Sequence, residues 1–68
     1  MYRTNFFNYN DRGRIGACCG QHGVTCTYNG RRAALVADDL AALKEVVAEC
    51  FDGHAKCSID GDVLLVNI

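Results

Sequence analysis

The sequence of 68 residues contains no proline, and no apolar run in it is as long as a secretory signal or a membrane span. Signal peptides need an apolar stretch of roughly 7–15 residues, and membrane helices need roughly 20. The residues after Met1 are instead Tyr-Arg-Thr-Asn. The sequence therefore predicts a soluble, cytoplasmic chain. Thiols stay reduced in that compartment, which weakens the expectation of a disulfide framework.

An excess of charge of one sign is also absent. The chain has 7 lysine and arginine residues against 8 aspartate and glutamate residues, a net charge of −1 and a pI near 6.0. Because nucleic-acid binding depends on a basic surface, we expect no direct contact with nucleic acid. The charge is nevertheless uneven: residues 1–34 carry +4 (five arginines, one aspartate), and residues 35–68 carry −5 (two lysines, seven acidic residues). This division favours one basic and one acidic face.

Repeats, linkers and low-complexity tracts are absent too, which predicts a single compact domain of residues 1–68. Half of the residues are hydrophobic, enough for a compact core and too many for a disordered tail. A chain this short buries only about 60% of its unfolded surface. We therefore expect its core to need support from a metal, a disulfide or a partner.

Residues 37–51 carry a helical pattern. Apolar residues recur there at steps of three and four, at Leu40, Leu43, Val47 and Cys50. This spacing places them on one stripe of an α-helix. Asp38 can cap the first turn with its carboxylate, and Gly53 can take the left-handed conformation after the last turn.

Two β-hairpins are predicted from Asn29-Gly30 and Asp60-Gly61, which are strong signals for tight turns. An Asn-Gly pair favours a type I′ turn, because both central residues of that turn need positive φ. The strands that these turns would join are residues 24–28 and 31–36, and residues 56–59 and 62–66. In the first of these strands, apolar and polar residues alternate as they do in a half-buried strand.

Residues 31–36 have a second interpretation. Val36 extends the apolar stripe of the helix backwards, so the helix could begin near Arg31. The pair Asp38-Asp39 suits the start of a helix better than its interior. We therefore favour the hairpin.

Residues 2–9 are rich in aromatic residues and predict a first strand. Phe6 and Phe7 are neighbours, so one should enter the core while the other lies on a surface or in an interface. Residues 10–13 predict a turn, and residues 14–19 a short strand or, because glycines surround them, a shaped loop. Strands, one helix and further strands predict an α+β fold. In it, a small antiparallel sheet of about four to five short strands packs on one face of a single α-helix.

Five cysteines and two histidines are the residues that most suggest chemistry. They form two clusters, residues 18–26 and residues 50–57, and each contains C-x6-C with a histidine inside. Zinc prefers four thiolate or imidazole ligands in a tetrahedron, often as pairs from two loops. The predicted zinc ligands are Cys19 (or Cys18), His22, His54 and Cys57. Bound metal would also stabilise so small a fold.

The same residues have other interpretations. Cys26, Cys50 and Cys57 lie on apolar faces of predicted elements, where free cysteine behaves as a small hydrophobe, and no C-x2-C pair marks a structural zinc site. A disulfide between the clusters would need an oxidising compartment. A cysteine nucleophile beside His22 or His54 would lack an orienting third residue, and a chain this small makes a poor pocket. We therefore do not expect an enzyme.

Two surfaces are candidates for binding a partner protein. The first is an acidic ridge on the polar side of the helix, made of Asp38, Glu45, Glu49 and Asp52. It has no interleaved basic residues, and it is either a solvated face or a contact surface for a basic partner, including a protein that handles nucleic acid. The second is an aromatic–arginine edge, made of Phe7, Tyr9, Arg12 and Arg14. These residue types are enriched in interfaces, although the aromatics could instead pack on the helix.

These features predict a small, non-enzymatic protein-interaction module or inhibitor that acts through the acidic ridge or the aromatic–arginine edge. In size and format the chain resembles small phage-encoded inhibitors of host machinery, anti-CRISPR proteins among them. That likeness implies steric or electrostatic blockade of a partner. A homodimer would also suit a basic first half and an acidic second half. The alternative function is a zinc-stabilised mini-domain with a binding or regulatory role, and no other cofactor is expected.

Overall fold

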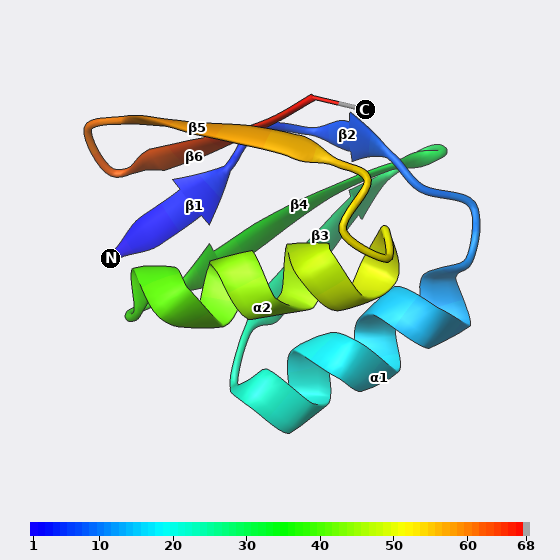
Figure 1. Ribbon diagram of the computed structural model, residues 1–68. Helices are drawn as coiled ribbons and strands as arrows, with labels where there is room; N and C mark the ends of the chain where they lie inside the picture. The colour runs from blue at the N-terminus through cyan, green and yellow to red at the C-terminus, as the bar shows by residue number, and fades with distance from the viewer. Residues whose placement is uncertain (68) are drawn as a thin grey trace.

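The computed structural model describes residues 1–67. In this part of the chain, two helices pack side by side on one face of a six-stranded sheet, which makes an α+β fold (Figure 1). The elements in chain order are β1 (Tyr2–Thr4), β2 (Phe7–Asn8), α1 (Arg12–His22), β3 (Thr25–Asn29), β4 (Arg32–Ala37), α2 (Leu40–Cys50), β5 (Lys56–Asp60) and β6 (Val63–Asn67). The α+β class is confirmed, whereas the single helix and the four to five strands are wrong.

The sheet is mixed, not antiparallel as predicted. β4 pairs antiparallel with β3 on one side and with β1 and β2 on the other, and β5 pairs antiparallel with β6. β1 and β6, however, pair in parallel. Alternation in a sequence identifies strands but not their neighbours, and β6 reaches β1 only after two helices and two hairpins. The strand direction at that pairing was therefore not predictable from local patterns.

β1 and β2 lie end to end along β4, as one strand that is interrupted by a β-bulge. Tyr2 pairs with Ala37, and Phe7 pairs with Ala33, so the β1–β2 side has one residue more than the β4 side between these pairs. An extra residue reverses which side chains face inward. The bulge thus directs both Tyr2 and Phe7 toward the helices and leaves Phe6 45% exposed. The prediction for the neighbouring phenylalanines is confirmed.

Side chains replace the backbone ladder at this bulge. The amide of Asn5 accepts from the N–H of Val66 at 2.7 Å and donates to its carbonyl at 3.1 Å. The hydroxyl of Thr4 accepts from the N–H of Leu35 at 2.9 Å. Because buried backbone groups must be paired, these bonds let the sheet continue across the interruption.

Both predicted hairpins are present. Asn29 pairs with Arg32 across the first turn, and Asp60 pairs with Val63 across the second, so each loop has two residues. Gly30 is the first loop residue and has a positive φ of 62°. Asn29, which the sequence pattern placed in the turn, does not have a positive φ. Positive φ at the first central residue alone is typical of a type II′ turn, so the type I′ prediction is wrong. The alternative of a helix starting near Arg31 is also wrong, because these residues form β4.

α2 lies where the apolar stripe predicts it. Its side chains Leu43, Val46, Val47 and Cys50 are buried. The cap is Asp39 instead of Asp38: its carboxylate accepts from the N–H of Ala41 at 3.0 Å. After the last turn, both Asp52 and Gly53 have positive φ, and the N–H of Gly53 donates to Ala48.

α1 replaces the strand or loop predicted for residues 14–19. Asp11 caps its start by accepting from the N–H of Arg14 at 3.0 Å, and Gly23 ends it with a φ of 68°. Only Ile15 and Cys19 are buried, one turn apart. Three glycines lower the helix propensity of this segment, so packing on the sheet and on α2 must supply most of its stability.

The hydrophobic core joins the sheet to both helices, and Ile15, Leu35, Leu43, Val46 and Leu64 are its largest fully buried side chains. Cys50 belongs to this core, as its place on the helix stripe suggests, but Cys57 is exposed. Neither of the two helices described combines the length and the apolar character needed to cross a membrane.

Candidate metal centre between the two helices

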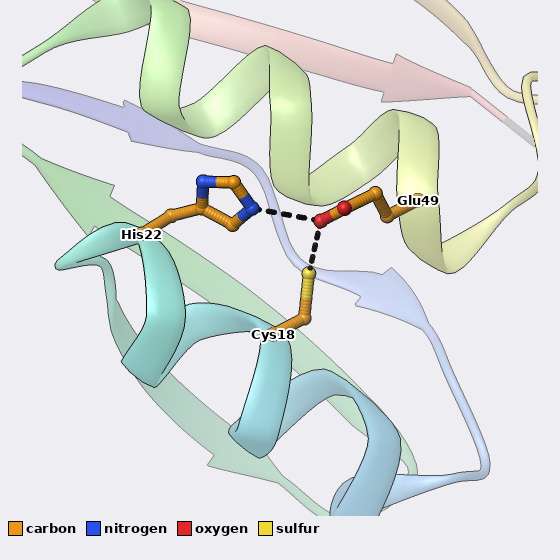
Figure 2. A group of neighbouring side chains, drawn as sticks. All are labelled: Cys18, His22 and Glu49. Carbon is orange, nitrogen blue, oxygen red and sulfur yellow. Dashed lines mark hydrogen bonds and ion pairs between the residues drawn. The ribbon is translucent and has the colours of Figure 1, made fainter.

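Two pairs of polar side chains face each other across the contact between α1 and α2. Cys18 and His22 lie four residues apart on α1, and Glu45 and Glu49 lie four residues apart on α2. Side chains with this spacing share one face of a helix. Figure 2 shows Cys18 and His22 pointing from α1 toward the carboxylate of Glu49.

The carboxylate of Glu49 joins the thiol and the imidazole. Its Oε2 accepts from the Sγ of Cys18 at 2.8 Å and lies 2.8 Å from the Nε2 of His22. The other ring nitrogen, Nδ1, lies 3.1 Å from the Oε2 of Glu45. A neutral imidazole can donate from only one nitrogen, so the ring satisfies both carboxylates only when it is protonated.

Three different metal-binding groups therefore converge on one point. The Sγ of Cys18, a ring nitrogen of His22 and a carboxylate oxygen of Glu49 all lie within 4.8 Å of one another. Thiolate, imidazole and carboxylate are the three ligand types that bind zinc in proteins. Glu45 contacts the second ring nitrogen of His22, Nδ1. A carboxylate in this position commonly orients a metal-bound histidine.

The local electrostatics keep the Cys18 thiol protonated. Burial and, next, the neighbouring carboxylate of Glu49 raise the pKa of Cys18 to about 12. The same contact acts in reverse on the carboxyl group: hydrogen bonds from Cys18 and then from His22 lower the pKa of Glu49. A thiol with so high a pKa is a poor nucleophile. A bound dication would reverse the situation, because coordination deprotonates a thiol outright.

The zinc ligands expected from the sequence are only partly brought together. His22 and the substitute ligand Cys18 lie in the cluster. Cys19 points into the core, and His54 and Cys57 lie beyond the end of α2, outside this cluster. Among residues 1–67, no group of three or more metal-binding residues contains these three. The structure does not bring the predicted set together, because that set paired residues by their similar spacing, which does not make the two segments neighbours.

The two glutamates were missed as metal-site residues. Their signal was in the sequence, since C-x3-H and E-x3-E each place two ligand side chains on one helical face. The first motif lay in a segment predicted as strand or loop, where that spacing has no such meaning. The second was assigned to the acidic ridge.

The acidic ridge has basic partners from α1, contrary to the expectation that it has none. Glu45 and Glu49 face His22, and the Oδ1 of Asp52 lies 3.1 Å from the Nη2 of Arg14. Arg14 also donates to the carbonyl of Glu49 at 2.7 Å. These carboxylates thus hold α1 against α2. The other member of the ridge, Asp38, is exposed and precedes α2 in the sequence.

The aromatic residues of the aromatic–arginine edge are largely internal, whereas Arg12 and Arg14 are exposed. Phe7 is buried, and its ring centroid lies 5.5 Å from that of Phe51. The ring of Tyr9 contacts Phe51 edge-on at 5.1 Å. Arg12 lies over the ring of Tyr28, 4.8 Å from its centroid. Phe7 and Tyr9 therefore pack at the end of α2, as the alternative interpretation of the aromatics expects, and present little surface to a partner.

Comparisons of the chain with protein-family models, with curated proteins and with solved structures gave no match. The contacts between α1 and α2 are therefore the main guide to function. They bring one thiol, one imidazole and two carboxylates together from two helices, in a cluster where the imidazole is 24% exposed and hence within reach of a metal ion from solvent.

Proposed function

We propose that the protein is a small, non-enzymatic zinc-binding domain that holds its metal between α1 and α2. Cys18, His22 and Glu49 would be the ligands. The observation that carries the proposal is the convergence of these three donor types within 4.8 Å of one another. Small side-chain rotations would bring them onto one ion, since zinc bonds to sulfur, nitrogen and oxygen are all about 2.0–2.3 Å long.

The mixed ligand set favours zinc over harder metals. Calcium and magnesium prefer oxygen ligands alone, whereas thiolate and imidazole suit zinc. Three protein ligands leave a fourth position open, which a water molecule or a side chain of a partner protein can fill. That arrangement suits a regulatory role. Zinc binding would then depend on the zinc concentration, or the bound zinc would link the domain to a partner.

Metal binding would also stabilise the fold. α1 has low helix propensity and two buried side chains, and it contacts α2 through the metal-site residues. A metal that bridges the two helices ties α1 to the rest of the domain, because binding energy for a folded site is folding energy. The proposal thus meets the need for extra support that the short chain imposes.

Titration of the reduced, metal-free protein with zinc tests the proposal. We expect one zinc ion to bind per chain, as measured by calorimetry and by native mass spectrometry. Cobalt substitution should produce a thiolate-to-metal charge-transfer band. The variants Cys18→Ser, His22→Ala and Glu49→Gln should each bind zinc at least ~10-fold more weakly, and Glu45→Gln should lose about 10–100-fold through the orientation of His22.

Matched controls use the residues that the sequence alone suggested. Cys57→Ser and His54→Ala remove the same chemical groups outside the cluster and should bind zinc like the wild type. The proposal is wrong if the wild type binds no zinc under these conditions. It is also wrong if the control variants lose zinc while Cys18→Ser retains it.

A second candidate function is the predicted protein-interaction module or inhibitor. The observation that favours it is the sheet face opposite the helices, where Phe6 is 45% and Leu65 39% exposed. Phe6 and Arg32 also line a cavity of about 260 Å³, together with Phe7, Asn8, Val66 and Asn67. Capture with the wild type and with Phe6→Glu as paired baits tests this candidate, since a specific partner must be lost with the variant. A partner bound equally by both baits rules out this face.

A further inference from the structure

β5 is an unprotected edge of the sheet. It is the last strand in the sheet order (Figure 1), and among residues 1–67 it pairs with β6 alone. Each of its residues is exposed. The strand contains Lys-Cys-Ser-Ile-Asp, residues 56–60. An edge strand of this kind presents free backbone N–H and C=O groups to another strand.

The hairpin determines which backbone groups point outward. Asp60 and Val63 flank a two-residue loop, so they form a hydrogen-bonded pair, and such pairs alternate along an antiparallel ladder. The backbone groups of Asp60, Ser58 and Lys56 therefore face β6. Those of Cys57 and Ile59 face outward and are available to a further strand.

The sequence of β5 is complementary to itself when two copies run antiparallel about a two-fold axis at Ser58. In this register Cys57 lies opposite Ile59 of the second copy, so the residues with free backbone groups meet and exchange hydrogen bonds. Lys56 lies opposite Asp60, and this charge pair occurs twice. A lysine on an edge strand normally prevents pairing, but here the facing aspartate would neutralise it.

The side chains on the helix side of β5 support the same register. Cys57 borders a cavity of about 240 Å³ between β5 and α2, which is also lined by Val47, Ala48 and Ala55. Ile59 is 53% exposed and lies on the same face of the strand as Cys57. Each Ile59 would contact Cys57 of the other copy at the open side of this cavity, so pairing would remove both apolar side chains from water.

We propose that the protein forms a two-fold symmetric dimer in which two β5 strands pair about Ser58 and join the two sheets into one. The occupant of this edge is a second copy of the chain. The contact is limited to one short strand and the adjacent cavity, which is smaller than most stable interfaces. The dimer is therefore weak, and its population rises with protein concentration. It uses none of the metal-site residues and exists with or without zinc.

A charge-swap experiment tests the register. We expect analytical ultracentrifugation of the wild type to show a monomer–dimer equilibrium. Lys56→Asp and Asp60→Lys each place like charges opposite one another twice, and each should weaken dimerisation at least ~10-fold. The double variant Lys56→Asp/Asp60→Lys restores both pairs and should return the dissociation constant to within about 3-fold of the wild type.

Cross-linking tests the position of the axis. In a Cys57→Ser background, Ser58→Cys places two thiols opposite each other in a pair without hydrogen bonds, close enough for a disulfide. Oxidation should yield a covalent dimer, whereas the control Thr27→Cys, on the exposed strand β3 at the other edge, should not. A monomer at every concentration overturns the proposal. So does a dimer that is insensitive to the charge swaps, because it must use another surface.

Discussion

At the scale of single residues, the surroundings of Cys18 suit both a protonated thiol and a metal-bound thiolate. Without metal, burial and the Glu49 carboxylate raise the pKa of its thiol to about 12, and the proton lies on the hydrogen bond between them. The buried thiol of Cys19 also has a pKa of about 12, chiefly because of burial. Cys57 is exposed on β5; partial desolvation raises the pKa of its thiol, and the charge of Lys44 opposes that rise.

Alkylation rates should follow these differences. With iodoacetamide at pH 8, a chelator and dilute protein, we expect Cys57 to react at least ~10-fold faster than Cys18 or Cys19, because the thiolate is the reactive form. Peptide mass spectrometry of timed samples gives the rate at each site. The three cysteines should react at similar rates in urea, which serves as the control. Preferential modification of Cys18 in the folded protein would contradict the shielding that we describe and would favour a reactive cysteine.

At the scale of elements, α1 is the helix that residue patterns did not reveal. Asp11 and Gly23 carry ordinary cap signals, but the glycines between them and the short apolar stripe of Ile15 and Cys19 concealed the helix. One glycine has a packing reason: a Cβ at Gly16 would lie 3.3 Å from the Oη of Tyr28. A Cβ at Gly20 would meet nothing within 4 Å.

This contrast predicts different effects of two alanine substitutions. Gly20→Ala should raise the free energy of unfolding by about 0.5–1 kcal/mol, because alanine favours the helix and nothing obstructs its methyl group. Gly16→Ala should gain less or lose stability, since Tyr28 must move. Urea unfolding of both variants in the presence of a chelator measures the difference. Equal gains from the two substitutions would show that Tyr28 does not pack on Gly16.

At the scale of the whole molecule, the sheet divides into a face covered by both helices and a face open to solvent. Neighbouring residues of β6 lie on opposite sides of this division: Leu64 is fully buried and Leu65 is 39% exposed. The two leucines have the same chemistry and adjacent positions. Which of the two is buried therefore depends directly on the register of the sheet.

Truncation of each leucine tests that register. Leu64→Ala should cost about 2–5 kcal/mol, the usual loss for a fully buried leucine, and failure of this variant to fold would agree with so large a loss in a small domain. Leu65→Ala should cost less than about 1 kcal/mol. Thermal and urea unfolding give both values. A larger loss for Leu65→Ala would mean that β6 is shifted by one residue, because such a slip exchanges the two faces.

The sequence by itself determined the elements whose signals are local. The apolar stripe of α2 follows from a spacing of three and four residues, and the two hairpins follow from Asn29-Gly30 and Asp60-Gly61. The opposite environments of Phe6 and Phe7 follow from their adjacent positions in an extended segment, where neighbouring side chains point to opposite sides. All of these depend on contacts between residues close together in the chain, so a pattern in a short window is enough.

Only the tertiary structure decided the features that depend on distant contacts. α1 is held by its packing, the parallel pairing of β1 with β6 joins the two ends of the chain, and the ridge carboxylates meet partners on a helix that no pattern predicted. The candidate metal site illustrates both levels. The four-residue spacings of Cys18 with His22 and of Glu45 with Glu49 are present in the sequence, but they form one site only because the core packs α1 against α2.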